Sequence, residues 1–245
     1  MTDGSRGTFS SGMSTIFAAR DAINVLRERA AATWEIPVKN VEWKGGQAIA
    51  KGSKYRKLKA MTLDQLAAAS PHTGGPIAGH SQLVADGAGV SFASHICDIE
   101  VDPETSATKV VRYTVIQDAG KAIYPSYVEG QMQGGSVQGI GWALNEEYLF
   151  DGEGQMLNPT MLDYRMPTAL DVPMIDTVII EVPNPSHPFG VRGVGEPPIV
   201  PPPPAIANAI KNATGLRMTE LPMSPPRLFA ALKGQENGGA QEQEL

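Results

Sequence analysis

One glutamate stands in a loop that consists mainly of glycine, valine and proline. The segment 190–198 reads Gly-Val-Arg-Gly-Val-Gly-Glu-Pro-Pro and places Glu196 between alternating glycines and two prolines. Such glycines let backbone amides approach a ligand, and the prolines restrict the loop, so the carboxylate can be held in one orientation beside that ligand. A carboxylate held in this way is suited to general-base catalysis. Taken alone, a Glu in a Gly/Pro loop is more often an ordinary surface residue.

Two further glycine-rich segments could also bind a ligand. The N-terminal segment 4–7, Gly-Ser-Arg-Gly, is a loop of small residues with free amides, which is what an anion site requires. The segment 127–144 has helical spacing of apolar residues but contains five glycines, each of which costs a helix up to ~1 kcal/mol relative to alanine. The glycines indicate that a ligand or another backbone lies close to this helix, and ordinary tight packing explains them about equally well.

Composition excludes several classes of function. The net charge of -6, without a dense Lys/Arg stripe, argues against nucleic-acid binding. The single cysteine, Cys97, cannot form an intrachain disulfide or supply an iron–sulfur cluster, and we expect it in a buried strand. The sequence contains no stretch long enough for a transmembrane helix and no secretory signal, which predicts a cytoplasmic protein without membrane contact. The basic run from Lys51 to Lys59 is interpreted as a solvated edge strand or hairpin, with a partner-docking patch as the alternative.

Periodicity predicts an α+β fold in which helices pack on mixed or antiparallel sheets. A Thr62–Gln65 capping box is expected to begin one short helix, and Ser10, Ser11 or Ser14 to cap an earlier one. Helices are expected at 16–34, 62–69, 127–144 and 204–214, and strands within 41–59, at 89–101 and 108–117 as a hairpin, at 148–157 as a short hairpin, and at 177–182.

Five segments resemble, in chain order, the xanthine dehydrogenase and aldehyde oxidase family of molybdenum hydroxylases. The resemblance covers nearly all of residues 1–233 and identifies the chain as similar to the C-terminal, molybdenum-cofactor-binding part of the family's large subunit. It implies one domain over 1–233, in two lobes, followed by a disordered tail at 234–245. The segments are DGSRGTFSSG, FASHICDIEVDPETSATKVVRYTVIQDAGKAIYP, EGQMQGGSVQGIGWALNEEYLF, LNPTMLDYRMPTALDVP and GVRGVGEPPIVPPPPAIANAIKNATG.

The resemblance also implies roles for individual residues. Glu196 matches the family's catalytic base, which takes a proton from the water-derived oxygen that attacks the substrate. Gln131 matches a glutamine that hydrogen-bonds near the molybdenum ligands, and no side chain is expected to ligate the metal. The remaining matches are expected to bind the cofactor, mainly through backbone groups; they are Gly4, Ser5, Arg6, Gly7, Val194 and Gly195.

The same resemblance implies cofactors and partners. The cofactor is molybdenum-molybdopterin, and the sequence leaves open whether it is the cytosine dinucleotide form. Iron–sulfur and FAD centres would lie on partner chains, because the cysteines and the flavin domain are absent here. The family's preceding N-terminal half of the molybdenum subunit is also absent, so we expect a hetero-oligomer that acts on an aldehyde, an N-heterocycle or a similar small molecule.

Several alternatives remain at this point. The chain could be a naturally split subunit or a fragment, and it could be a non-catalytic assembly subunit of such a complex. A polyproline ligand at 197–204 is disfavoured, because apolar residues on both sides indicate burial.

Overall fold

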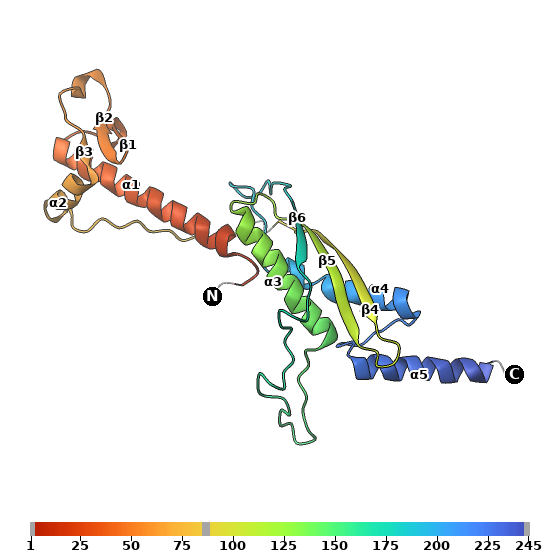
Figure 1. The fold of residues 1–245 in the computed structure, drawn as a ribbon. Helices are drawn as coiled ribbons and strands as arrows, with labels where there is room; N and C mark the ends of the chain where they lie inside the picture. Colours follow the sequence, from red (N-terminus) through yellow and green to blue (C-terminus); the bar gives the residue numbers. More distant parts are fainter. Residues whose placement is uncertain (1–2, 85–88, 243–245) are drawn as a thin grey trace. The chain divides into compact units, whose positions relative to one another are not determined.

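The computed structural model describes residues 3–84 and 89–242, with side chains described up to 234. The chain forms two compact units (Figure 1). One consists of Met1–Ser5 together with Asp86–Leu245, and the other of Arg6–Ala85. Within the described residues, no helix combines the length and the apolar character needed to cross a membrane.

The larger unit is built on a mixed three-stranded sheet. The strands β4 (Ala93–Val101) and β5 (Thr108–Asp118) pair antiparallel, which confirms the hairpin predicted from the sequence. The strand β6 (Ile175–Ile180) pairs parallel with β5. A mixed sheet packed with helices agrees with the predicted α+β class.

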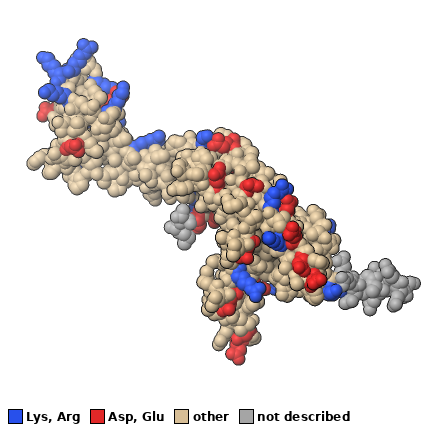
Figure 2. Space-filling view, in the orientation of Figure 1, with Lys and Arg blue, Asp and Glu red and all other residues tan. Residues whose placement is uncertain are grey.

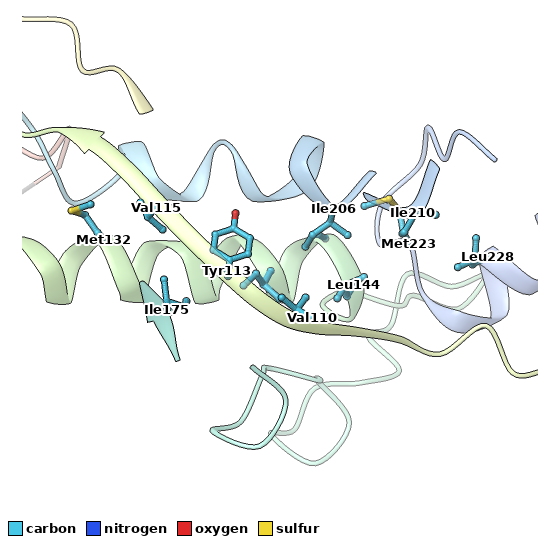
Figure 3. Close-up of a cluster of buried hydrophobic side chains, with 12 residues drawn as sticks. Val110, Tyr113, Val115, Met132, Leu144, Ile175, Ile206, Ile210, Met223 and Leu228 are labelled. Carbon is cyan, nitrogen blue, oxygen red and sulfur yellow. The ribbon is translucent and has the colours of Figure 1, made fainter. Parts of the chain in front are cut away.

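Two helices and the sheet enclose the main hydrophobic core (Figure 3). The helix α3 (Pro125–Leu144) contacts β5 and β6, and α4 (Pro202–Thr214) contacts β4 and α3. Tyr113 of β5 is fully buried between them. A fully buried large apolar side chain contributes roughly 1.5–3 kcal/mol, so this core fixes α3 and α4 on the sheet. Its other buried members include Val110, Val115, Met132, Ile140, Leu144, Ile175, Ile206, Ile210, Met223 and Leu228.

Three titratable groups lie inside the β4–β5 hairpin. The His95 Nδ1 atom and the Tyr113 hydroxyl share a hydrogen bond of 2.8 Å. Burial lowers the pKa of His95 to about 4 and raises the pKa of Tyr113. Burial, with a smaller contribution from Asp98, raises the pKa of Cys97 to about 12. The half-buried Cys97 thus lies in a strand, as predicted.

The smaller unit contains a long helix, a small sheet and a short helix. These are α1 (Met13–Trp34), the antiparallel strands β1 (Val41–Lys44), β2 (Gln47–Ala50) and β3 (Met61–Thr62), and α2 (Leu63–Thr73). The capping box at Thr62 and Gln65 is present as predicted. The predicted serine cap of α1 is wrong: Gly12 is the N-cap, because a π-helical turn at Gly7–Gly12 leads directly into the helix.

The basic run of the smaller unit lies between two of its strands. Figure 2 shows Lys and Arg side chains gathered at one end of this unit. The run connects the antiparallel strands β2 and β3 and includes a single 3-10 turn, Ser53–Tyr55, so it is the predicted hairpin connection and not an edge strand. All five side chains are exposed: Lys51, Lys54, Arg56, Lys57 and Lys59.

Two regions in the second half of the chain differ from the expected elements. Residues 145–174 form a long irregular segment (Figure 1) in which Phe150 and Met156 make a single bridge instead of a full hairpin. The helix α5 spans Pro225–Glu242 and was not expected from periodicity. It enters the segment 234–245, for which a disordered tail remains a prediction.

Candidate functional site

The loop that carries Glu196 is held by neighbouring segments along most of its length. The Gly190 carbonyl accepts hydrogen bonds from the Lys121 and Asn184 backbone amides, at 2.8 and 2.9 Å. Gly190 has a φ of 68°, a left-handed conformation that glycine adopts without strain. The Gly193 carbonyl accepts a 2.8 Å hydrogen bond from the Ser91 hydroxyl. These contacts fix the path of the chain toward Glu196.

Ser5 contacts both the backbone and the carboxylate of Glu196. The Glu196 amide donates a 2.8 Å hydrogen bond to the Ser5 Oγ, and the same hydroxyl lies 3.3 Å from the Glu196 Oε2, to which it donates. Ser5 has a φ of 56°, which is strained for a residue other than glycine. The Glu196 side chain is exposed in this chain. Ser5 therefore orients a carboxylate that remains accessible.

Gln131 reaches the same loop from α3. A Cβ atom placed on Gly195 would lie 2.9 Å from the Gln131 Oε1 and 3.4 Å from the Ser5 Oγ. A side chain at position 195 would therefore displace the end of the Gln131 side chain. Residues that are far apart in the sequence, Ser5, Gln131 and Glu196, are thus brought together around Gly195.

Glycines of α3 allow the segment after Glu196 to lie directly on the helix. A Cβ atom on Gly135 would lie 2.8 Å from the Pro198 ring, and one on Gly139 would lie 2.8 Å from the Ile199 carbonyl oxygen. Pro198 itself is buried. Close approach of another backbone, one of the two explanations offered by the sequence, therefore applies to these two glycines. Gly130 and Gly134 face open space and have no such neighbour.

The other predicted cofactor residues lie near the start of the chain. Gly4 is exposed and has a left-handed φ of 58°. Arg6 and Gly7 belong to the smaller unit, where Gly7 begins the π-helical turn that precedes α1. The structure thus groups Gly4 and Ser5 with the larger unit, whereas Arg6 and Gly7 remain candidates on the sequence alone.

The donor groups around Glu196 fit an oxygen-rich, anionic ligand. Within the described chain, the backbone amides of Val194 and Gly195 donate to no other group, and neither does the exposed Gln131 amide. A side-chain amide can donate and accept hydrogen bonds at once. The residues present therefore fit the polar edge of a pterin cofactor. Among residues 3–84 and 89–242, no group of three or more His, Cys, Asp or Glu side chains could hold a metal ion directly.

Three contributions were not found from the sequence. Ser91 reaches the loop through a side-chain hydrogen bond to the Gly193 carbonyl, and nothing in the local sequence pattern marks it. Ser5 was expected to act through its backbone, whereas its hydroxyl makes both contacts to Glu196. Gln133, to which no role was assigned, donates to the Ile175 carbonyl at 3.2 Å and ties α3 to β6.

Comparisons with known proteins identify the family of this chain. Residues 1–173 match the family model of the molybdopterin cofactor-binding domain. The xanthine dehydrogenase molybdenum-binding subunit of Escherichia coli O157:H7 is 37% identical over 160 residues, which cover 65% of this chain and 21% of that protein. The 6-hydroxypseudooxynicotine dehydrogenase complex subunit gamma of Paenarthrobacter nicotinovorans is 31% identical over 240 residues, which cover 94% of this chain and 30% of that protein.

Solved structures with a similar fold come from the same family of enzymes. The crystal structure of quinoline 2-oxidoreductase from Pseudomonas putida 86 superimposes with a TM-score of 0.72 at 28% identity, over 95% of this chain and 30% of that one. The chain thus spans less than a third of the length of these relatives. Because the family model matches more than two thirds of the sequence, the chain belongs to the molybdopterin cofactor-binding domain family of the molybdenum hydroxylases.

Proposed function

We propose that this chain binds a molybdenum–pterin cofactor and supplies the catalytic base of a hydroxylase or dehydrogenase. The observation that carries the proposal is the convergence of Ser5, Gln131 and Glu196 around Gly195. The proposed substrate is an aldehyde, an N-heterocycle or a similar small molecule, with water as the oxygen source. The cofactor, when bound, supplies the two-electron oxidation, and the protein supplies orientation and proton transfer. The cytosine dinucleotide form of the pterin is an open alternative within this proposal.

Each residue at the site has a distinct task in this reaction. The Glu196 carboxylate accepts the proton of the attacking water, and the Ser5 hydroxyl keeps that carboxylate in a fixed orientation. The Gln131 amide and the free Val194 and Gly195 amides bind polar atoms of the cofactor. Gly4, Arg6 and Gly7 are proposed to contribute further backbone donors to the pterin and its phosphate.

The experiment that tests Glu196 uses the complex purified from its own cells. Glu196→Gln keeps the shape and hydrogen-bonding capacity of the side chain but removes its basicity, so we expect turnover per bound molybdenum to fall by about 10²–10⁴-fold. Substrates would be an aldehyde, xanthine, quinoline and carbon monoxide, each with a dye as electron acceptor. Glu100→Gln, an exposed carboxylate on β4, is the matched control and should have no effect.

Two outcomes would contradict the catalytic proposal. Full activity of Glu196→Gln with normal molybdenum content would remove Glu196 from the mechanism. A complex without molybdenum or pterin phosphate would favour the alternative function, a non-catalytic assembly subunit. Native mass spectrometry with metal analysis reports the partners and the metal in one measurement.

The irregular segment 145–174 is the proposed contact with the missing part of the large subunit. Its large apolar side chains are unusually exposed: Leu162 is 93%, Leu170 94% and Met174 85% exposed. Exposed apolar surface of this kind marks an interaction site, and more than two thirds of the length of the relatives lies outside this chain. We propose that the N-terminal half of the molybdenum subunit covers it, with iron–sulfur and FAD subunits completing a complex in the cytoplasm.

Assembly can be tested independently of catalysis. The double variant Leu162→Ser and Leu170→Ser should reduce the fraction of chain found in the complex by native mass spectrometry, because it removes apolar area from the contact. Val84→Ser, at an 87% exposed valine of the smaller unit, is the control. Equal assembly of both variants would exclude segment 145–174 as this interface.

A further inference from the structure

A nearly buried ion pair joins the Glu196 loop to the end of the sheet. The Arg192 Nε lies 3.0 Å from the Asp118 Oδ2, and the two side chains are only 11% and 9% exposed. Arg192 also donates to the Val182 carbonyl at 3.0 Å and to the Val90 carbonyl at 2.7 Å. The second Asp118 oxygen, Oδ1, accepts from the Gly120 and Val182 amides at 2.8 and 3.1 Å. Both charges are therefore paired and hydrogen-bonded.

This pair lies where the ends of two strands meet the Glu196 loop. Asp118 is the last residue of β5, and Val182 follows the end of the parallel strand β6. The loop itself joins them through a bridge between Gly120 and Val191 and a 3.2 Å hydrogen bond from the Arg192 amide to the Ala119 carbonyl. Arg192 thus fixes its loop to the carboxyl ends of two adjacent parallel strands.

Arg192 is also the last charged anchor before Glu196. Only Gly193, Val194 and Gly195 lie between them. Within the described residues, this stretch makes one hydrogen bond, from Ser91 to the Gly193 carbonyl, and otherwise only close approaches, of Ser5 to Gly193 and Gly195 and of Gln131 to Gly195. Glycine resists displacement less than any other residue, because its backbone has the widest range of conformations. Removal of either partner would leave the other charge unpaired in a nearly buried position. The loop would then move so that water can reach this charge.

We infer that Arg192 and Asp118 are positioning residues that set the location of the Glu196 carboxylate. The inference rests on the proposed function of Glu196, but its first consequence, a fixed loop, is independent of that function. Neither residue is proposed to touch the substrate. Their effect on catalysis passes through the backbone from 192 to 196.

The experiment uses the purified complex and two readouts. Arg192→Met keeps the length of the side chain and removes its charge, and Asp118→Asn keeps an oxygen acceptor and removes its charge. Because a misplacement of about 1 Å can cost about 10²-fold in rate, we expect each variant to lower kcat per bound molybdenum by about that factor, with KM within twofold. Hydrogen exchange of peptides covering 190–196 should accelerate, whereas peptides covering α4 should be unchanged.

Two further variants complete the design. Arg192→Lys restores a positive charge without the planar fork and should recover at least about a tenth of the wild-type kcat, because the ion pair with Asp118 re-forms. Arg112→Met removes the exposed ion pair between Arg112 and Asp98 on the β4–β5 hairpin, whose side chains are 66% and 45% exposed. This matched control should change neither kcat nor exchange at 190–196.

The outcomes separate this inference from the proposed function. Wild-type kcat and wild-type exchange at 190–196 in Arg192→Met would overturn the inference, and so would an acceleration of exchange that extends through the whole sheet. An Arg192→Lys variant as inactive as Arg192→Met, with equally fast exchange, would also overturn it. Full activity of Glu196→Gln would instead refute the proposed function, while the exchange measurement would still decide whether the pair fixes the loop.

Discussion

Replacement of Gly139 by alanine should destabilise the protein, although alanine is the better helix former. A Cβ atom at this position would lie 2.6 Å from the Pro202 Cγ and 2.8 Å from the Ile199 carbonyl oxygen, whereas ordinary contacts begin at 3.4 Å. Both neighbours resist movement, because one is a proline ring and the other is backbone. Something must shift by roughly half an ångström or more, which is the overpacking that core substitutions produce.

The expected size follows from two opposing effects. Alanine in place of glycine inside a helix contributes about 1 kcal/mol of stability, and overpacking costs about 1–3 kcal/mol. Because the obstacle at Gly139 is rigid, we expect a net loss of about 1–2 kcal/mol. Gly134→Ala, on the same helix but facing open space, has only the favourable effect and should gain about 0.5–1 kcal/mol.

Thermal unfolding of the purified chain distinguishes the loss of stability expected for Gly139→Ala from the gain expected for Gly134→Ala. For a chain of this size, 1 kcal/mol corresponds to about 2–4 °C in Tm, so the two variants should move Tm in opposite directions. In the complex, Gly139→Ala should also lower kcat, because Ile199 lies in the turn that directly follows Glu196. An increase of Tm in Gly139→Ala equal to that in Gly134→Ala would refute the assignment of Gly139 as a packing requirement.

Three further predictions concern single side chains. Ser5→Ala and Ser5→Gly both remove the hydroxyl that orients Glu196 and should lower kcat equally. The glycine variant should have the higher Tm, because a left-handed φ costs alanine roughly 1–2 kcal/mol and costs glycine almost nothing. The pKa of His95 is lowered by burial to about 4, so the unfolded state binds a proton more readily than the folded state. The contribution of neutral His95 to stability should therefore be complete above its unfolded pKa of about 6.5 and should be lost as the pH falls toward 4. Urea denaturation at pH 5 and pH 7 would show this loss, and His95→Gln should reduce it. Because burial raises the pKa of Cys97 to about 12, iodoacetamide at pH 8 should alkylate Cys97 only after unfolding, and rapid labelling of the native chain would contradict the raised pKa.

The sequence predicted those elements whose signal is local. The hairpin from Ala93 to Asp118 is marked by runs of β-branched residues on both sides of a turn, and the cap of α2 by the spacing of Thr62 and Gln65. The serine cap of α1 was predicted wrongly, because the π-helical turn before it satisfies the helix end without a side chain. A π-helical turn has no simple sequence signature.

The site was predictable in its parts but not in its assembly. Glu196, Gln131 and Ser5 were named from resemblance, because each lies in a recognisable motif. Their mutual contacts depend on how α3 and the loop pack on the sheet, and no local pattern encodes that packing. The ion pair of Arg192 with Asp118 is a similar case, since two charged residues 74 positions apart carry no sign of pairing in the sequence.

The contact between Ser5 and Glu196 also constrains when the site can form during synthesis. Its partners are separated by 191 positions, so translation must pass residue 196 before the serine can meet the glutamate. Closure of so long a loop is entropically costly and depends on the sheet and α3 being in place first. Cofactor insertion should therefore be a late event that acts on a completed fold, and nascent chains that stop before residue 196 should bind pterin weakly even though they contain Gly4, Ser5 and Gln131.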